Sequence, residues 1–96
     1  MNPKRVDRNH AAIRDMLREL KYKVADTHEA SNGFPDLVVA IDTTTCLLLE
    51  VKMPGEKLTE AEAKFHCDFP VAIVHDIEEA IDAIEDAKIN RHVKRN

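Results

Sequence analysis

The hydrophobic positions of this chain follow a helical period near both of its ends. In residues 7–20 apolar side chains recur every three or four positions, which predicts an amphipathic helix. Its apolar face consists of Ile13, Met16, Leu17 and Leu20. The same spacing returns in the last third of the chain, after a cap-type start formed by Asp76 and Glu79. The face of that second predicted helix consists of Ile77, Ala80, Ile81, Ile84 and Ala87.

Between these two helices the pattern changes to short apolar runs that predict β-strands. Leu37–Ile41 and Cys46–Val51 are almost unbroken, as in strands covered on both faces. Val71–Val74 predicts another strand, and Tyr22 and Val24 alternate with less apolar residues in a short one. Thr59 followed by Glu62 is a capping box, which predicts a helix to about Cys67. Turn-forming residues separate these elements at positions 26–35, 42–45 and 53–55. The predicted fold is therefore α/β, in the order αβββαβα.

Length and composition restrict the class of protein. Ninety-six residues, 44% of them hydrophobic, predict one domain over residues 1–96. No apolar run approaches the roughly 20 residues of a membrane span, and the charged N-terminal sequence is unlike a secretory signal. Cys46 and Cys67 lie far apart in apolar surroundings, so we expect reduced core thiols of a cytoplasmic protein (the host cytoplasm, if the protein is viral).

Charge is distributed unevenly along the chain. The net charge is −4, and the acidic residues are concentrated in positions 21–87. Both ends are basic, so they could contact phosphates locally despite the net sign. On charge alone, the interpretation as solvated ends is favoured. The candidate nucleic-acid contacts at the ends are Lys4, Arg5, Arg8, Arg91, Lys94 and Arg95.

The triplet Glu50-Val51-Lys52 is the first candidate for chemistry. A carboxylate two residues before a lysine occurs four times in the chain, but only this triplet lies on a predicted strand. Residues i and i+2 of a strand share a face, whereas on a helix they point apart. Glu50 and Lys52 also close a buried run, where charged groups are costly unless they are paired or bound to a ligand.

Asp36 opens the neighbouring strand and is the natural companion of Glu50. If the two strands form a hairpin with a loop of three residues, Ile41 pairs with Thr45 and Asp36 meets Glu50 on one face. A loop of four residues would turn Asp36 away, unless a β-bulge restored the parity of the strand. Two carboxylates form a hard oxygen site for a divalent cation, and a lysine beside them suits phosphodiester hydrolysis. The competing interpretation is a Glu50–Lys52 salt bridge at the strand end, with Asp36 capping a turn.

These residues also carry a resemblance to a known family. The chain contains Gly33-Phe34-Pro35-Asp36-Leu37-Val38-Val39, then Leu48-Leu49-Glu50-Val51-Lys52, then Lys57-Leu58-Thr59 and Lys64-Phe65-His66. In this order they resemble the PD-(D/E)XK nuclease superfamily, and in particular the small stand-alone VRR-NUC domain proteins of bacteriophages, which are related to Holliday-junction resolvases. The resemblance implies a restriction-endonuclease-like mixed sheet flanked by helices. It also implies that Asp36, Glu50 and the Val51 carbonyl bind Mg²⁺ or Mn²⁺ and that Lys52 is catalytic.

The chain departs from the family pattern at two places. A glutamine is common in the helix after the lysine, and this chain has Glu62 there, which the capping box already explains. An acidic residue is common in the first helix, and the matching stretch here is Asn9-His10. Asn9, His10 and Glu62 are therefore accessory candidates. The histidines show no zinc spacing, although His28 lies close enough in sequence to Gly33 to approach a bound phosphate.

The sequence thus predicts a metal-dependent DNA endonuclease, a hydrolase acting on branched or structured DNA as a two-fold homodimer. Only two glycines are present, so no phosphate-cradling loop binds a nucleotide cofactor and a kinase or ATPase is excluded. The alternative is a catalytically inactive nucleic-acid-binding protein with a nuclease fold. A third interpretation is a small interaction domain whose charged strand end is only a salt bridge.

Overall fold

Three helices and four strands make up the protein. The computed structural model describes the backbone of residues 5–93 and the side chains of residues 9–90. The elements are α1 (Arg5–Glu19), β1 (Val24–Asp26), β2 (Leu37–Ala40), β3 (Cys46–Val51), α2 (Glu60–Asp68), β4 (Val71–Val74) and α3 (Ile77–Val93). The predicted order αβββαβα is confirmed. None of the helices within this part of the chain is long and apolar enough to cross a membrane.

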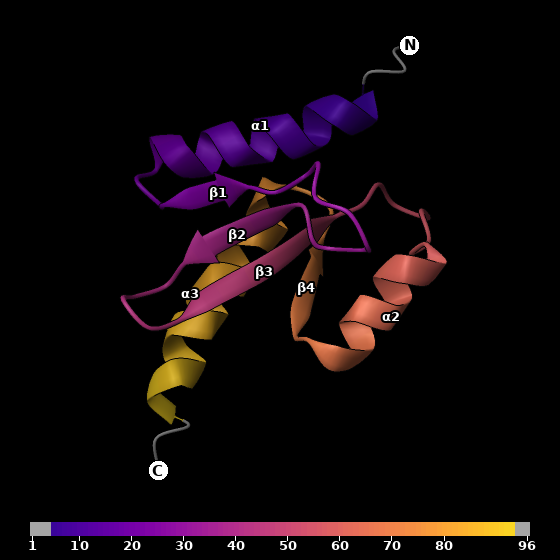
Figure 1. The fold of residues 1–96 in the computed structure, drawn as a ribbon. Coiled ribbons are helices and arrows are strands. Elements are labelled where there is room, and N and C mark those ends of the chain that lie inside the picture. The colour runs from indigo at the N-terminus through magenta and orange to yellow at the C-terminus, as the bar shows by residue number, and fades with distance from the viewer. Residues whose placement is uncertain (1–4, 94–96) are drawn as a thin grey trace.

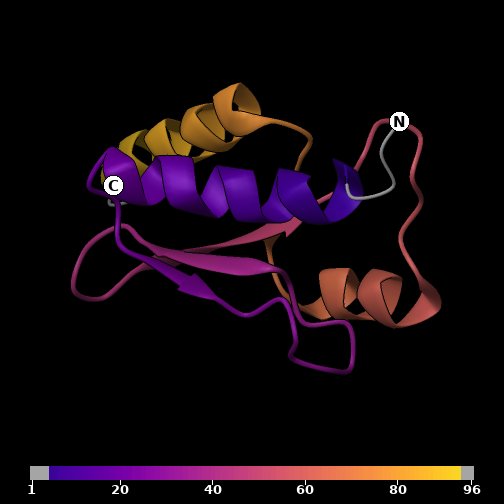
Figure 2. The same cartoon turned by 90° about the horizontal axis from the view of Figure 1, so that it is seen from above.

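The strands form one mixed sheet in the order β1-β2-β3-β4. The first three strands are antiparallel neighbours, and β4 returns parallel to β3 after the crossover through α2. Figures 1 and 2 show that α1 and α3 lie together on one side of the sheet. In both views α2 stands apart from these two helices, beside the end of the sheet that β3 runs towards. The α/β class with a restriction-endonuclease-like sheet is confirmed.

The hydrophobic core occupies the face of the sheet that α1 and α3 cover. Alternate strand residues point into it, as the two-residue period of a strand requires. Its fully buried members are Ile13 and Leu17 of α1, Leu37 and Val39 of β2, Leu49, Val74, and Ala80 and Ile84 of α3. The amphipathic stripes predicted for the first and last helices therefore do pack against the sheet.

The expectation that the two central strands are covered on both faces is wrong. On the second face Ala40 and Cys46 are exposed and Ile73 is 44% exposed. The only helix available for this face is α2, and none of its residues is buried. The apolar runs reflect one covered face and a second face that is only partly covered, where Val38 and Leu48 are half-buried. An unbroken apolar run does not encode this distinction.

The structure corrects several smaller predictions. Cys46 and Cys67 are free thiols, but both are exposed rather than in the core, because Cys46 lies on the open face and α2 buries nothing. The first helix ends at Glu19, and Lys21 adopts a left-handed φ of 77°. Leu20 is therefore beyond the helix and 53% exposed, and the short strand begins at Val24 rather than at Tyr22.

Candidate active site

The hairpin of β2 and β3 sets the position of Asp36 relative to Glu50. The strands pair from Leu37 opposite Leu49 onward, and the Ile41 amide donates to the Thr45 carbonyl at 2.9 Å. This is the register of a three-residue loop, which was one of the two alternatives that the sequence left open. The same register continued by one residue brings Asp36 beside Glu50. There the Asp36 Oδ2 accepts a hydrogen bond from the Val51 amide at 2.9 Å.

Glu50 is a buried carboxylate with an unsatisfied oxygen. The residue is 2% exposed, and its Oε1 has no hydrogen-bond partner among the described residues. Burial, together with the negative charges of Asp36 and Glu62, raises the pKa of Glu50 to about 8, against the opposing effect of Lys52. The cation nearest to an ionised Glu50 is Lys52, which is shared with Glu56 and Glu62.

Lys52 lies among three carboxylates. Its Nζ is 2.7 Å from Glu62 Oε1, 3.6 Å from Glu56 Oε2 and 3.7 Å from Glu50 Oε2, and the residue is 6% exposed. Burial alone would lower the pKa of Lys52, but the hydrogen bond to Glu62 and the surrounding negative charges raise it. The predicted Glu50–Lys52 salt bridge is therefore the longest of three contacts, and the ammonium stays protonated.

Glu62 combines two roles that the sequence interpretation treated as alternatives. The capping box is present, with the Glu62 amide donating to Thr59 Oγ1 at 3.1 Å and the Thr59 amide donating to Glu62 Oε1 at 2.9 Å. The same Oε1 accepts the hydrogen bond from Lys52. Preferring the cap over a place in the site was therefore incomplete, because one oxygen serves both.

A second network reaches Asp36 from the side of α1. His28 Nδ1 lies 3.2 Å from Asp36 Oδ1. His28 stacks on His10, with ring centroids 4.3 Å apart, and His10 Nε2 lies 3.1 Å from Asp26 Oδ1. Thus His10 has no direct contact with Asp36 and is linked to it only through His28. Asn9 points elsewhere and donates to the His75 carbonyl at 3.2 Å.

Sequence reasoning missed two members of this arrangement. Asp26 ends β1 and accepts hydrogen bonds from Arg14 Nη1 at 2.7 Å and from the His28 amide at 3.0 Å. Glu56 approaches Lys52 from the turn that follows β3. An aspartate side chain commonly accepts from the backbone amide two residues later in a turn, as Asp26 does from His28. This turn signal could have indicated Asp26. The spacing of four residues between Lys52 and Glu56 carries no such meaning outside a helix.

The donor set fits a single hard cation. Asp36 and Glu50 supply carboxylate oxygens, the ligands that Mg²⁺ and Mn²⁺ prefer, and the unpartnered Glu50 Oε1 is an acceptor that a cation would satisfy. Within residues 9–90, no group of three or more histidine, cysteine, aspartate or glutamate side chains is arranged to hold a metal ion. The ligands that the family resemblance implies are the two carboxylates and the Val51 carbonyl.

Comparison with known proteins identifies the family. A model of the VRR-NUC domain matches residues 5–69, which is more than half of the chain. The chain belongs to the VRR-NUC domain family. This family comprises PD-(D/E)XK-like nuclease domains, so the predicted resemblance is confirmed and the activity of the family is that of a nuclease. Neither the curated proteins nor the solved structures gave a significant match.

The matched segment of the VRR-NUC domain contains every residue of the candidate site. Asp36, Glu50, Lys52 and Glu62 all lie between residues 5 and 69. Nucleases of this superfamily generally use a divalent metal, which agrees with the carboxylate pair described above. The strand β4 and the helix α3 lie beyond the match, and they contribute to the core rather than to the site.

The basic ends of this VRR-NUC domain chain lie mostly outside what the structure describes. Lys4, Lys94 and Arg95 fall outside the described residues, and for Arg5, Arg8 and Arg91 only the helical backbone is described. Figure 1 shows the first turn of α1 and the last turn of α3 at opposite ends of the molecule. The described helix turns that carry Arg5, Arg8 and Arg91 are therefore not brought together within one copy.

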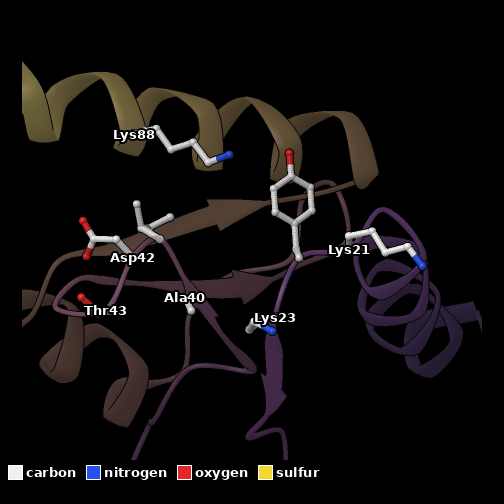
Figure 3. A pocket seen from close by; sticks show the side chains of 8 residues that line it. Lys21, Lys23, Ala40, Asp42, Thr43 and Lys88 are labelled. Atoms are coloured by element: carbon white, nitrogen blue, oxygen red, sulfur yellow. The ribbon is translucent and has the colours of Figure 1, made fainter.

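The VRR-NUC domain also has a pocket away from the carboxylates, at the hairpin end of the sheet. It measures about 610 Å³, and its lining residues are Lys21, Tyr22, Lys23, Ala40, Ile41, Asp42, Thr43 and Lys88. In Figure 3, Lys88 points into it from α3, whereas Lys21 points away. The Lys88 ammonium is already 3.3 Å from Glu85 and 5.2 Å from the centre of the Tyr22 ring. This pocket is separate from the candidate active site.

Proposed function

We propose that this VRR-NUC domain protein is a metal-dependent endonuclease that hydrolyses phosphodiester bonds in branched or otherwise structured DNA. The observation that carries the proposal is Glu50, which is buried beside Asp36 and Lys52 with one oxygen unsatisfied. A carboxylate kept in this state costs stability unless it serves a ligand. Its placement is what a cation-assisted phosphodiesterase needs.

The two carboxylates have the task of holding the cation. Asp36 and Glu50, with the Val51 carbonyl that the family resemblance implies, would bind one Mg²⁺ or Mn²⁺. When bound, the ion polarises the phosphoryl group and lowers the pKa of the attacking water. The Val51 amide and His28 keep the Asp36 carboxylate oriented while this happens.

Lys52 acts as a charged group and not as the base. Because neighbouring carboxylates raise its pKa, the ammonium keeps its proton and can stabilise the extra negative charge of the transition state. In the hydrolysis, the water oxygen bonds to phosphorus, one phosphorus–oxygen bond breaks, and a proton reaches the departing oxygen. We expect substrate phosphate to compete with Glu62 for the Lys52 Nζ.

The open face of the sheet supports the expectation of a two-fold homodimer. Ala40, Cys46 and Ile73 are exposed on this face, with Lys23 beside Ala40 and Glu50 beside Ile73. A two-fold arrangement pairs this face with its own copy and can cover the exposed apolar residues. Two copies also provide two centres for two strand cuts. Light scattering at micromolar concentration tests this part, and a monomeric mass would contradict it.

A cleavage panel tests the activity. Labelled four-way junctions, flaps, nicked duplexes, plain duplexes and single strands are incubated with Mn²⁺, with Mg²⁺ or with EDTA, using the wild type and Asp36→Asn. We expect metal-dependent cleavage of a branched substrate in preference to plain duplex, and none by the variant. Binding without cleavage under all conditions would favour the inactive nucleic-acid-binding protein instead.

A further inference from the structure

Both oxygens of the Asp36 carboxylate have a protein partner. The Val51 amide donates to Oδ2 at 2.9 Å, and His28 Nδ1 lies 3.2 Å from Oδ1. The Asp36 side chain is only 14% exposed. With one contact on each oxygen, the plane of the carboxylate is fixed, and lone pairs remain on both oxygens for a cation.

His28 is itself held from three directions. Its backbone amide donates to Asp26 Oδ1 at 3.0 Å, and its ring stacks on His10 at 4.3 Å with an angle of 26°. The preceding residue, Thr27, donates from its amide to the Asp36 carbonyl at 2.8 Å and from its hydroxyl to the Pro35 carbonyl at 2.7 Å. The hydrogen bonds fix the backbone at His28, and the imidazole cannot turn away from Asp36 without losing its stack on His10.

Asp26 joins this arrangement to α1. Its Oδ2 accepts from Arg14 Nη1 at 2.7 Å. Its Oδ1 accepts from the His28 amide and lies 3.1 Å from His10 Nε2. Burial opposes ionisation of this group, but these hydrogen bonds lower the pKa of Asp26 to about 2. The charged Asp26 carboxylate thus holds both His10 of α1 and the backbone of His28. His28 therefore lies between α1 and Asp36.

We propose that His28 is a positioning residue for Asp36: its Nδ1–H donates to Oδ1 and holds the carboxylate in the orientation that binds the catalytic cation. This inference rests on the proposed function, in which Asp36 is a metal ligand. Groups that hydrogen-bond to a ligand in this way raise metal affinity by limiting the orientations that must be lost on binding. The role differs from a direct contact between His28 and a substrate phosphate.

Metal affinity without DNA is the decisive measurement. Mn²⁺ binding is followed by electron paramagnetic resonance in the wild type, His28→Ala, His28→Asn and His28→Gln. Asparagine keeps an N–H donor near the place of Nδ1, whereas glutamine carries its donor one bond further out. We expect His28→Ala and His28→Gln to weaken Mn²⁺ binding by about 10- to 100-fold, and His28→Asn to restore most of it.

Controls separate this inference from the function on which it rests. Glu29→Ala changes an exposed residue of the same loop and should bind Mn²⁺ like the wild type. Asp36→Asn should lose Mn²⁺ binding, and adding His28→Ala to it should cause no further loss. If Asp36→Asn binds Mn²⁺ normally, the proposed metal site is wrong. If Asp36→Asn loses binding but His28→Ala does not, only the positioning role is overturned.

A second measurement distinguishes positioning from phosphate contact. DNA binding in EDTA is compared for the wild type and His28→Ala as a function of salt. A positioning residue leaves the affinity and the salt dependence unchanged. A slope of log K against log salt that flattens by nearly one unit would show a lost phosphate contact, and together with unaltered Mn²⁺ affinity it would overturn the proposal.

Discussion

Asp26 and Glu50 are two carboxylates in the same small sheet, and their surroundings are opposite. Asp26, at the end of β1, receives hydrogen bonds from Arg14 and from the His28 amide and contacts His10. These contacts lower its pKa to about 2 although burial acts against them. Glu50, near the end of β3, has an unpartnered oxygen, and burial with two neighbouring carboxylates raises its pKa to about 8.

The contrast distinguishes a structural carboxylate from one that is suited to a ligand. Donors supplied by the fold compensate the desolvation of Asp26, so its charge stabilises the native state. Glu50 lacks such compensation and faces two further acids, so its charge destabilises the native state until a cation arrives. Carboxylates whose environments drive their pKa values apart commonly have different roles. The predictions that follow alter one side of this contrast at a time.

The largest effect is expected from removing the carboxylates that would bind the cation. Asp36→Asn and Glu50→Gln each take away a negative ligand of the cation and should lower the cleavage rate by about 10³-fold or more, which corresponds to several kcal/mol of transition-state stabilisation. Single-turnover cleavage with saturating Mn²⁺ measures this. Wild-type rates in either variant would contradict the assignment of the site.

The next largest effect concerns the positive charge of the Lys52 ammonium. Lys52→Met should lower turnover by about 10²- to 10³-fold, as is usual when one charge-stabilising donor is lost, and should leave Mn²⁺ affinity nearly unchanged. Lys64→Met removes an exposed lysine of α2 and serves as the matched control. A loss of folding without a separate kinetic effect would instead favour the structural salt bridge.

The raised pKa of Glu50 predicts how stability depends on pH in the absence of metal. The unfolded chain loses this proton near pH 4.5, whereas the folded protein keeps it until about pH 8. The stability contributed by the protonated form is therefore present below pH 4.5 and is lost as pH rises from about 4.5 to 8. Denaturant unfolding in EDTA should show a decline of a few kcal/mol, and Glu50→Gln should flatten it.

The smallest of the four effects tests Asp26, the carboxylate whose charge is stabilised by hydrogen bonds. Asp26→Asn should reduce the free energy of unfolding at pH 7 by about 1 kcal/mol, because hydrogen bonds lower the pKa of Asp26 to about 2 while exposure to solvent screens part of that gain. Since that pKa is depressed, the stabilisation is present above about pH 4 and is lost as pH falls towards 2. The variant should lack this acid-dependent step.

Asp15→Asn is a matched control for this variant. Asp15 also bonds Arg14, at 2.8 Å, but it is 63% exposed. Its removal should cost little stability, as for other exposed ion pairs. Equal losses of unfolding free energy in the two variants would contradict the stronger stabilisation assigned to Asp26.

Much of the fold could be predicted from the sequence because local signals there are strong. The helical spacing of Ile13 and Leu17 and the capping box of Thr59 and Glu62 are short-range patterns, and the structure confirms each. The pairing of β2 with β3 was predictable up to one residue of loop length. That single residue decides whether Asp36 faces Glu50, and it depends on hydrogen bonds of the turn that the sequence does not specify.

The rest of the site depends on contacts between distant segments. The competing interpretation paired Lys52 with Glu50, its neighbour on the strand, but Glu62 is closer because α2 begins beside the end of β3. The contact of His28 with Asp36 requires α1, β1 and the loop together. Coverage of the sheet could not be predicted from apolar runs alone, since Ile73 and Val74 are equally apolar and only Val74 is buried.

One oxygen of Glu62 links the chemistry of the site to the local unfolding of a helix. Glu62 Oε1 accepts from both Lys52 Nζ and the Thr59 amide, and no residue of α2 is fully buried. Elements with few buried contacts open at the lowest free energy, and their amide protons exchange first. A phosphate that draws the ammonium away from Glu62 changes the strength of this cap. The exchange rates of the amides in the first turn of α2 should therefore report whether the site is occupied, without a label on the substrate.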